Sequence, residues 1–325
     1  MIDASIRDVL SKDAQKLFDD IVTQKVLGAS THIKMISQMI QDLCSTAHRN
    51  NELPDSLNAK IHKLANFFIQ TRGEASQAIT NAMNIMIEGS DDQTQGDLNS
   101  FIEHILQNIV SFEKTNRHNL ELVNQYAQSV LSRMHAILLF DYSSTVGTML
   151  ETCDHSLEVF IAESRSFDGG RPYVQQSLRG QHKVHFIPDA AIYHYLKHCD
   201  GVFIGSETHY ADGKVFNTIG SELVAHLCKI FDVPFYVLTT LIKIDIRSIY
   251  GYIKRPLMLN LRDKISPNFD DETKDQIDFS CPELVEIPSK FVTAFITEVG
   301  IVPPSAIFQL STEYLKRNGE NSKHA

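Results

Sequence analysis

The spacing of apolar residues changes near residue 130, and this change limits the possible folds more than any other feature of the chain. Before it, apolar residues recur at three- and four-residue steps, as in Ile33, Ile36, Ile40 and Leu43. Such stripes are typical of amphipathic helices. Stretches rich in turn-forming residues separate the stripes at 50–56 and 89–97. The spacing predicts an all-helical domain over residues 1–130.

Short apolar runs replace the stripes beyond this point. Five of them, separated by segments of helix length, lie at 135–140, 157–164, 182–188, 201–206 and 234–240. Continuous apolar strands that alternate with helices indicate a parallel sheet covered on both faces. The expected fold class is therefore α/β, with the helical domain followed by a Rossmann-like parallel sheet domain over 131–325 that holds a ligand crevice.

Composition narrows the classes of function. The 325 residues carry a formal net charge of -10, which argues against broad nucleic-acid binding. The five cysteines show no paired metal-binding spacing, and their odd number without a secretory signal fits a reducing cytosol. No apolar run approaches the roughly 20 residues needed to span a bilayer. We expect a cytoplasmic protein with no cofactor, no metal and no direct contact with nucleic acid or membrane.

Polar residues follow each predicted strand. Ligands bind outside the carboxyl ends of strands in such sheets. Carboxylates, cations and hydroxyls gathered there suit an anionic polyol such as a sugar phosphate. No G-x-G-x-x-G or P-loop motif is present. The candidates at these positions are Asp141, Ser143, Ser144, Glu163, Arg165, Arg171, Asp189, Glu207, Asn217, Gly220 and Lys243.

Several of these residues also have an ordinary structural interpretation. Ser143, Ser144 and Asp189 are good helix N-caps, and capping is the commoner role for such residues. Asp141 suits a cap or an arginine partner, and Arg165 and Arg171 suit solvated turns. The sequence is compatible with both the ligand-binding and the structural interpretation of these residues.

Three histidines have similar alternatives. His194 and His198 lie four residues apart and could ligate a metal, but a partly exposed helix face explains them better. His209 follows Glu207 closely in the stretch GSETHYADGKVFNTIGS (205–221), which we expect to be a polar loop that leads into a helix. His209 is a possible acid–base group, although a solvent-facing loop histidine is the expectation.

The longer segment CDGVFIGSETHYADGKVFNTIGSELVAHLCKIFDVPFYV resembles the signature of a known family. That family unites methylthioribose-1-phosphate isomerase, ribose-1,5-bisphosphate isomerase and the alpha, beta and delta subunits of translation initiation factor 2B. Further matches are ESRSFDGGRP, IPDAAIYHYLKHCD and AFITEVGIVPPSAI, so the resemblance covers roughly residues 130–310. It implies a helical domain before a Rossmann-like one, and a homodimer formed through the C-terminal domain.

The chain departs from the family at the positions that the resemblance assigns to catalysis. Asp141 stands at or near the isomerases' cysteine, and Glu207 replaces their catalytic aspartate. Leu27 stands for the arginine of the family's R-G-A segment, and Thr218 for the lysine of its N-K-I-G segment. By the same resemblance, the chain keeps part of the family's ligand-binding set, namely Glu163, Arg165, Asp189, Asn217, Gly220 and Lys243.

Two functions follow from the resemblance. The first is a sugar-phosphate or nucleotide binding protein like the regulatory alpha subunit of initiation factor 2B, with translation-factor subunits as candidate partners. The alternative is an aldose–ketose isomerase acting on a ribose-1-phosphate-type substrate, either ribose-1,5-bisphosphate or methylthioribose-1-phosphate. In that case Asp141 and Glu207 are the catalytic pair, dividing the proton-transfer roles.

Overall fold

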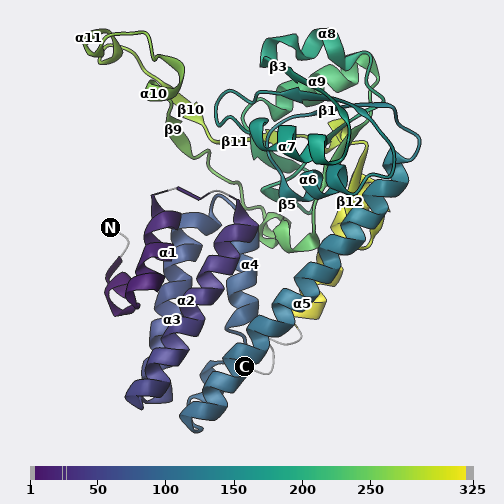
Figure 1. The fold of residues 1–325 in the computed structure, drawn as a ribbon. Helices are drawn as coiled ribbons and strands as arrows, with labels where there is room; N and C mark the ends of the chain where they lie inside the picture. Colours follow the sequence, from purple (N-terminus) through teal and green to yellow (C-terminus); the bar gives the residue numbers. More distant parts are fainter. Residues whose placement is uncertain (1–3, 24, 27, 320–325) are drawn as a thin grey trace. The chain divides into compact units, whose positions relative to one another are not determined.

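The chain forms two compact units in a computed structural model that describes residues 4–23, 25–26 and 28–319 (Figure 1). The first unit runs as far as His118 and includes Ile242–Ile244 and the chain from Thr312. The second unit comprises Asn119–Leu241 and Asp245–Ser311. The division falls inside one long helix, earlier in the chain than residue 130. Within the described residues, no helix is both long and apolar enough to cross a membrane.

The first unit is a helical bundle, as the apolar stripes predict. Helix α1 packs on α2, which packs in turn on α3 and α4, and the predicted stripe residues Ile36 and Ile40 are fully buried. Ser11 caps α1 through its side chain, and Pro54 opens α3. Up to His118 the described residues contain no strand. The elements are η1 (Ala4–Val9), α1 (Lys12–Val22), α2 (Ala29–Asn50), α3 (Pro54–Phe68), η2 (Ile69–Gly73), α4 (Gln77–Met86), η3 (Asp91–Gln93) and α5 (Leu98–Leu131).

The second unit is built on a seven-stranded sheet with the order β13-β12-β7-β4-β1-β2-β3. Neighbours pair in parallel except β12 and β13, which are antiparallel. All five predicted strands are present, and the sequence reasoning missed β12 and β13. The strands are β1 (Ala136–Leu139), β2 (Glu158–Ala162), β3 (Lys183–Ile187), β4 (Gly201–Ile204), β7 (Phe235–Leu238), β12 (Ala294–Thr297) and β13 (Gly300–Val302).

Helices cover both faces of this sheet, which explains why its strands are apolar throughout. On one face Ile137 and Leu139 of β1 pack with side chains of α5, α6 and α7. On the other, Leu138 packs with side chains of α8, α9 and α12. Outside the arm, the helices that follow β1 along the chain are α6 (Ser144–Glu151), α7 (Arg171–Arg179), η4 (Asp189–Ala191), α8 (Ile192–Leu196), α9 (Ser221–Phe231), η5 (Leu241–Lys243), η6 (Ile246–Tyr250), η7 (Ser289–Phe291), η8 (Pro304–Ala306) and α12 (Ile307–Gly319). The last residues of η5 and most of α12 belong to the first unit.

The stretch 205–221 is a β-hairpin, so the expectation of a polar loop is wrong. Strands β5 (Thr208–Tyr210) and β6 (Val215–Thr218) pair antiparallel around a turn in which Gly213 has a φ of 80°. The Asp212-Gly213 pair is a recognised hairpin signal. The polar residues of the two strands hid the pattern. The strands belong to a small sheet with the order β11-β6-β5-β8, completed by β11 (Leu284–Ile287) and β8 (Ile244–Asp245).

A separate arm of the second unit extends away from its main sheet (Figure 1). It is a two-stranded antiparallel ribbon that carries two short helices at its tip. Apolar side chains are exposed along the arm and the segment that leads to it, including Ile253, Met258 and Phe269. The elements are β9 (Met258–Asn260), α10 (Arg262–Ile265), α11 (Asp271–Lys274) and β10 (Ser280–Pro282).

Candidate functional site

The order of the strands identifies the point on the sheet edge where a ligand is expected to bind. From β1 the chain continues to β2 and β3 on one side, then crosses to β4 and β7 on the other. Adjacent β1 and β4 are therefore the point where the winding reverses, and ligands bind at the carboxyl ends of such strands. Asp141 follows β1, and Glu207 follows β4. Both predicted catalytic residues thus follow the two strands that flank the switch point.

Asp141 is a buried carboxyl group without a cation beside it. Its side chain accepts a hydrogen bond of 2.6 Å from the Thr218 hydroxyl, and among the described residues none forms an ion pair with it. Burial is the main cause that raises the pKa of Asp141 to about 6, and the charge of Glu207 raises it further. Hydrogen bonds from Thr218 and from the Tyr142 backbone oppose these effects. The interpretation of Asp141 as a helix cap or an arginine partner is therefore wrong.

Glycines let three loops close on the end of β1. A Cβ added at Gly169 would lie 2.3 Å from Oδ1 of Asp141, and one at Gly205 would lie 2.6 Å from Oγ of Ser143. Gly220 has a φ of 100°, and a Cβ there would lie 2.6 Å from Cζ of Phe140. Because the chain after β2, the chain after β4 and the start of α9 all approach this point, the strand ends form one site.

The two serines lie at the start of α6. Ser143 occupies the N-cap position, but its side chain makes no capping hydrogen bond. Its backbone N–H donates to the buried Tyr173 hydroxyl over 2.7 Å. Ser144 is the first residue of the helix. The capping role considered for Ser143 is absent, which leaves its hydroxyl at the strand end, against Gly205.

The chain after β2 is held by Asp189. The two carboxylate oxygens accept hydrogen bonds of 2.9 Å from the backbone N–H groups of Ser164 and Arg165. The N-cap residue of η4 is Pro188 and Asp189 is the first residue of this helix, so the N-cap interpretation is wrong. Ser164 has a φ of 48°, a conformation that costs energy for a residue with a Cβ. The carboxylate stabilises this strained turn and links the ends of β2 and β3.

The cationic candidates on this side are exposed. Arg165 projects from the strained turn, and Arg171 opens α7, where its Nε lies 3.9 Å from Oδ1 of Asp168. Glu163 is half-buried, and its backbone N–H donates to the carbonyl of Ile187 over 2.9 Å. Both arginines remain predicted ligand residues.

The hairpin β5–β6 carries the candidates on the other side. The backbone N–H of Glu207 donates to the Phe216 carbonyl over 3.0 Å, so the hairpin fixes the backbone at this residue. Asn217 is buried and its Nδ2 donates to Ser221 Oγ over 3.0 Å. His209 is fully buried on β5, so the expectation of a solvent-facing loop histidine is wrong. His194 and His198 are exposed, as expected of a surface helix.

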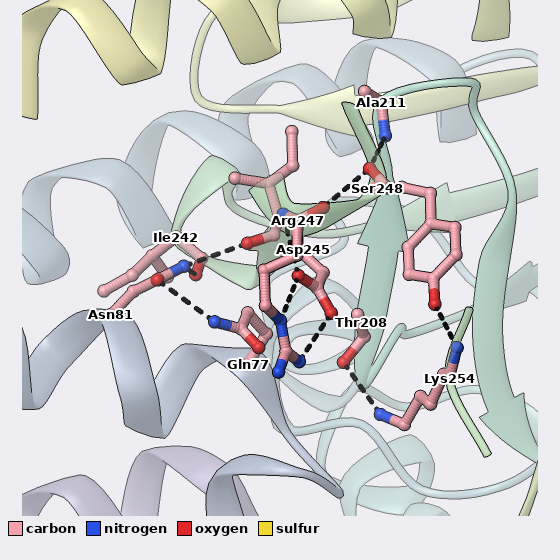
Figure 2. A network of polar contacts seen from close by, with 11 residues as sticks. Gln77, Asn81, Thr208, Ala211, Ile242, Asp245, Arg247, Ser248 and Lys254 are labelled. Carbon is pink, nitrogen blue, oxygen red and sulfur yellow. Dashed lines mark hydrogen bonds and ion pairs between the residues drawn. The ribbon is translucent and has the colours of Figure 1, made fainter. Parts of the chain in front are cut away.

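A second polar network supports the same hairpin from its other edge (Figure 2). Buried Asp245 accepts two hydrogen bonds from the Arg247 guanidinium, at 2.9 and 2.8 Å, and Ser248 Oγ donates to its carbonyl. Ser248 Oγ also accepts from the backbone N–H of Ala211 in the hairpin. Lys254 Nζ donates to Thr208 Oγ1 over 3.4 Å, next to Glu207. The network fixes the hairpin without entering the group around Asp141.

One predicted ligand residue, Lys243, belongs to the first unit. Lys243 lies in the short segment that packs within the first unit, where Asn81 Nδ2 donates to the carbonyls of Ile242 and Ile244 (Figure 2). Leu27 lies outside the described residues. The structure thus brings together Asp141, Ser143, Glu207 and Gly220, while the role of Lys243 stays a prediction.

Comparison with known proteins gives a consistent picture. The model of the initiation factor 2 subunit family matches residues 27–304. A ribose 1,5-bisphosphate isomerase of Haloterrigena turkmenica is 23% identical over 312 residues, 91% of each chain. The translation initiation factor eIF2B subunit alpha of Dictyostelium discoideum is 26% identical over 195 residues, which cover 57% of this chain and 60% of that protein.

A solved structure has the same fold. The 5-methylthioribose 1-phosphate isomerase of Pyrococcus horikoshii OT3 superposes with a TM-score of 0.74 at 17% identity, over 95% of this chain and 92% of that one. At this identity the likeness establishes the fold alone. It confirms the expected α/β fold with a helical N-terminal region.

Proposed function

Since the chain belongs to the initiation factor 2 subunit family, we propose that it is an aldose–ketose isomerase acting on a phosphorylated ribose, with ribose 1,5-bisphosphate as the first substrate to test. The Haloterrigena isomerase aligns over 91% of the chain, whereas the Dictyostelium alpha subunit aligns over 57%. This coverage supports the isomerase, the second of the two expectations from sequence, over the regulatory subunit.

The observation that carries the proposal is the carboxyl pair at the switch point. Isomerisation of an aldose needs one group to remove the C2 proton and another to manage protons on the sugar oxygens. Asp141, whose pKa is raised to about 6 by burial, exchanges its proton close to neutral pH. Glu207 lies near enough for its charge to raise that pKa. Two carboxyl groups in different environments can divide acid and base roles.

The remaining candidates would bind the sugar and its phosphates. We assign the exposed Arg165 and Arg171 to phosphate, because guanidinium groups bind phosphate oxygens in pairs of hydrogen bonds. Other proposed binding residues are Ser143, Ser144, Glu163, Asp189, Asn217, Gly220 and Lys243. Asp189 would act through the backbone that it holds.

Turnover is the direct test. The pure protein is incubated with ribose 1,5-bisphosphate, or with methylthioribose-1-phosphate, in deuterated water, and ketose signals are followed by NMR. We expect deuterium at the carbon that exchanges its proton, and loss of turnover in Glu207→Gln and Asp141→Asn. Glu286→Gln is the matched control, because Glu286 is an exposed carboxylate on strand β11 of the same small sheet.

One observation favours a second candidate, a ligand-binding regulator without turnover. Thr218 stands where the family has a lysine, and its hydroxyl is engaged by Asp141. A regulator would gain thermal stability from the sugar phosphate or a nucleotide without forming ketose. Its partners would include translation-factor subunits. If neither sugar phosphate forms ketose, and neither they nor nucleotides change the melting temperature, both candidates fail.

We also propose that the chain forms a homodimer through its second unit. The arm exposes apolar side chains, among them Ile253 with 81% of its surface accessible. Exposed apolar surface of this kind marks interaction sites. Light scattering of the pure protein should give twice the mass of one chain, and a mass of 36.7 kDa would contradict the proposal.

A further inference from the structure

A cluster of three potential metal ligands lies at the opposite edge of the main sheet. Cys153, Asp154 and His155 are consecutive and connect the end of α6 to the start of β2. Asp141 lies at the carboxyl edge, while this cluster lies at the amino edge, a separation of about 16 Å along a five-residue strand. The cluster therefore has no part in the site described above.

The distances suit a single small cation. Cys153 Sγ lies 3.6 Å from His155 Nδ1, and Asp154 Oδ1 lies 3.0 Å from the same nitrogen. The three ligand atoms all lie within 4.8 Å of one another. With Zn–S of about 2.3 Å and Zn–N or Zn–O of about 2.1 Å, these two separations subtend about 110° and about 90° at a shared ion. The first angle is that of a tetrahedron, and the second is compressed from it.

The histidine is oriented as a ligand. His155 Nε2 lies 3.0 Å from the carbonyl oxygen of Met134. Carbonyl and carboxylate oxygens only accept hydrogen bonds, so without an ion Nε2 donates to Met134 and Nδ1 donates to Asp154. A bound ion would replace the hydrogen on Nδ1, while Nε2 keeps its bond to the carbonyl. A metal-ligating histidine typically donates its other N–H group to a carboxylate or a backbone carbonyl in this way.

The surroundings allow an ion to enter. Cys153 is half-buried, while the side chain of Asp154 is 93% exposed. An ion can therefore approach from solvent on the aspartate side and keep water in its fourth position. Thiolate, imidazole and carboxylate together are a ligand set of zinc and chemically similar divalent ions.

We propose that Cys153, Asp154 and His155 form a binding site for one zinc-type divalent cation. The ion would fasten the α6–β2 connection to the segment before β1, through His155 and Met134, and so stabilise the amino edge of the sheet. Motif reasoning missed the site because three adjacent ligands lack the paired spacing of zinc motifs.

Cobalt binding tests the site in the full-length, tag-free protein. The chelator-treated protein is titrated with Co²⁺, and the thiolate-to-cobalt charge-transfer absorption is recorded. We expect a band that saturates at one equivalent and disappears when Zn²⁺ is added. Cys153→Ser should abolish the band. Cys281→Ser is the matched control, because Cys281 is also half-buried, and it should leave the band unchanged.

The other two ligands provide independent variants. His155→Gln and Asp154→Asn should each weaken cobalt binding at least tenfold. Asp154 is so exposed that its variant will fold even if the histidine variant does not. A wild-type titration without the charge-transfer band, or a band that survives in Cys153→Ser, would overturn the proposal. If Asp154→Asn and wild type bound cobalt with equal affinity, Asp154 would not be a ligand, and the proposed three-residue site would be wrong.

Discussion

Asp141 and Asp245 are both buried carboxyl groups of the second unit, and they differ in what surrounds them. Asp245 has 1% of its surface accessible and accepts two hydrogen bonds from the Arg247 guanidinium, which also stacks on Tyr252 at 3.9 Å. Asp141 has 8% accessible and is bound by a hydroxyl, with the negative charge of Glu207 nearby. The charge of Asp245 is neutralised by Arg247, whereas Asp141 has no cationic partner among the described residues.

The difference separates a structural group from a candidate functional one. A paired buried carboxylate fixes the chain around it, as Asp245 fixes the hairpin through Ser248 and Ala211. An unpaired one that is raised in pKa beside another carboxylate lowers stability, and groups of this kind concentrate at functional sites. The two residues should therefore respond oppositely to loss of their charge.

Asp245→Ala should give the largest effect. It removes the two bonds to Arg247 and the N-cap of η6, where the side chain accepts from the backbone N–H of Arg247. We expect the free energy of unfolding to fall by about 2.5 kcal/mol, because charged hydrogen bonds and a helix cap are lost. The Arg247 side chain is 40% exposed, so water solvates it in the variant. Urea unfolding measures the change.

The control for that variant is Glu286→Ala, at an exposed carboxylate 3.4 Å from Lys214. Exposed pairs contribute little, so the free energy of unfolding should change by less than about 0.5 kcal/mol. Equal losses in the two variants would show that the Asp245–Arg247 pair has no special role.

Asp141→Asn should change stability in the opposite direction at high pH. The unfolded chain ionises this group near pH 4 and the folded protein near pH 6, so the folded state binds the additional proton between these values. Wild-type stability therefore falls as the pH rises through this window. The variant lacks the ionised group, so it should exceed wild type by about 2 kcal/mol at pH 8.

The gain of Asp141→Asn should vanish at pH 4, where the wild-type carboxyl is protonated in the folded state. Urea unfolding at both pH values measures it, and Asn accepts the positive φ of 57° at this position. If the variant were less stable than wild type at pH 8, Asp141 would be a structural residue like Asp245.

Asp189→Asn should give the smallest effect. Its environment is intermediate, because backbone N–H groups bind its carboxylate in place of the guanidinium that binds Asp245 or the hydroxyl that binds Asp141. Its carboxylate accepts two backbone N–H groups, and an amide can accept only one of them. We expect a loss of about 1 kcal/mol in unfolding free energy and a larger KM for the sugar phosphate, because the turn that carries Arg165 loosens. An unchanged KM would show that Asp189 does not support substrate binding.

The sequence predicted the regular parts of the fold and missed the parts that depend on pairing. Five apolar strands and the helical stripes are local patterns, and each is present. The hairpin β5–β6 was missed because its buried residues include Thr208, His209 and Asn217, which are polar. Strand β12 pairs with β7 across a long stretch of chain, and no local pattern indicates that pairing.

The site was predicted as a set of strand ends, but not as a set of contacts. Placement of Asp141 and Glu207 followed from the parallel sheet alone. The bond between Thr218 and Asp141 joins residues 77 apart, and that of Asp189 ends on backbone groups, which no side-chain motif reveals. The sequence pattern therefore located the site, while the charge environment that distinguishes its two carboxyl groups required the structure.

A carbon-13 NMR titration of the Asp141 carboxyl, in wild type and in Glu207→Gln, tests the central claim most directly. We predict that the pKa of Asp141 is about 6 in wild type and lower in the variant, because the charge of Glu207 is one cause of the increase. An Asp141 pKa near the ordinary value of about 4, or one that does not respond to the variant, would contradict the account.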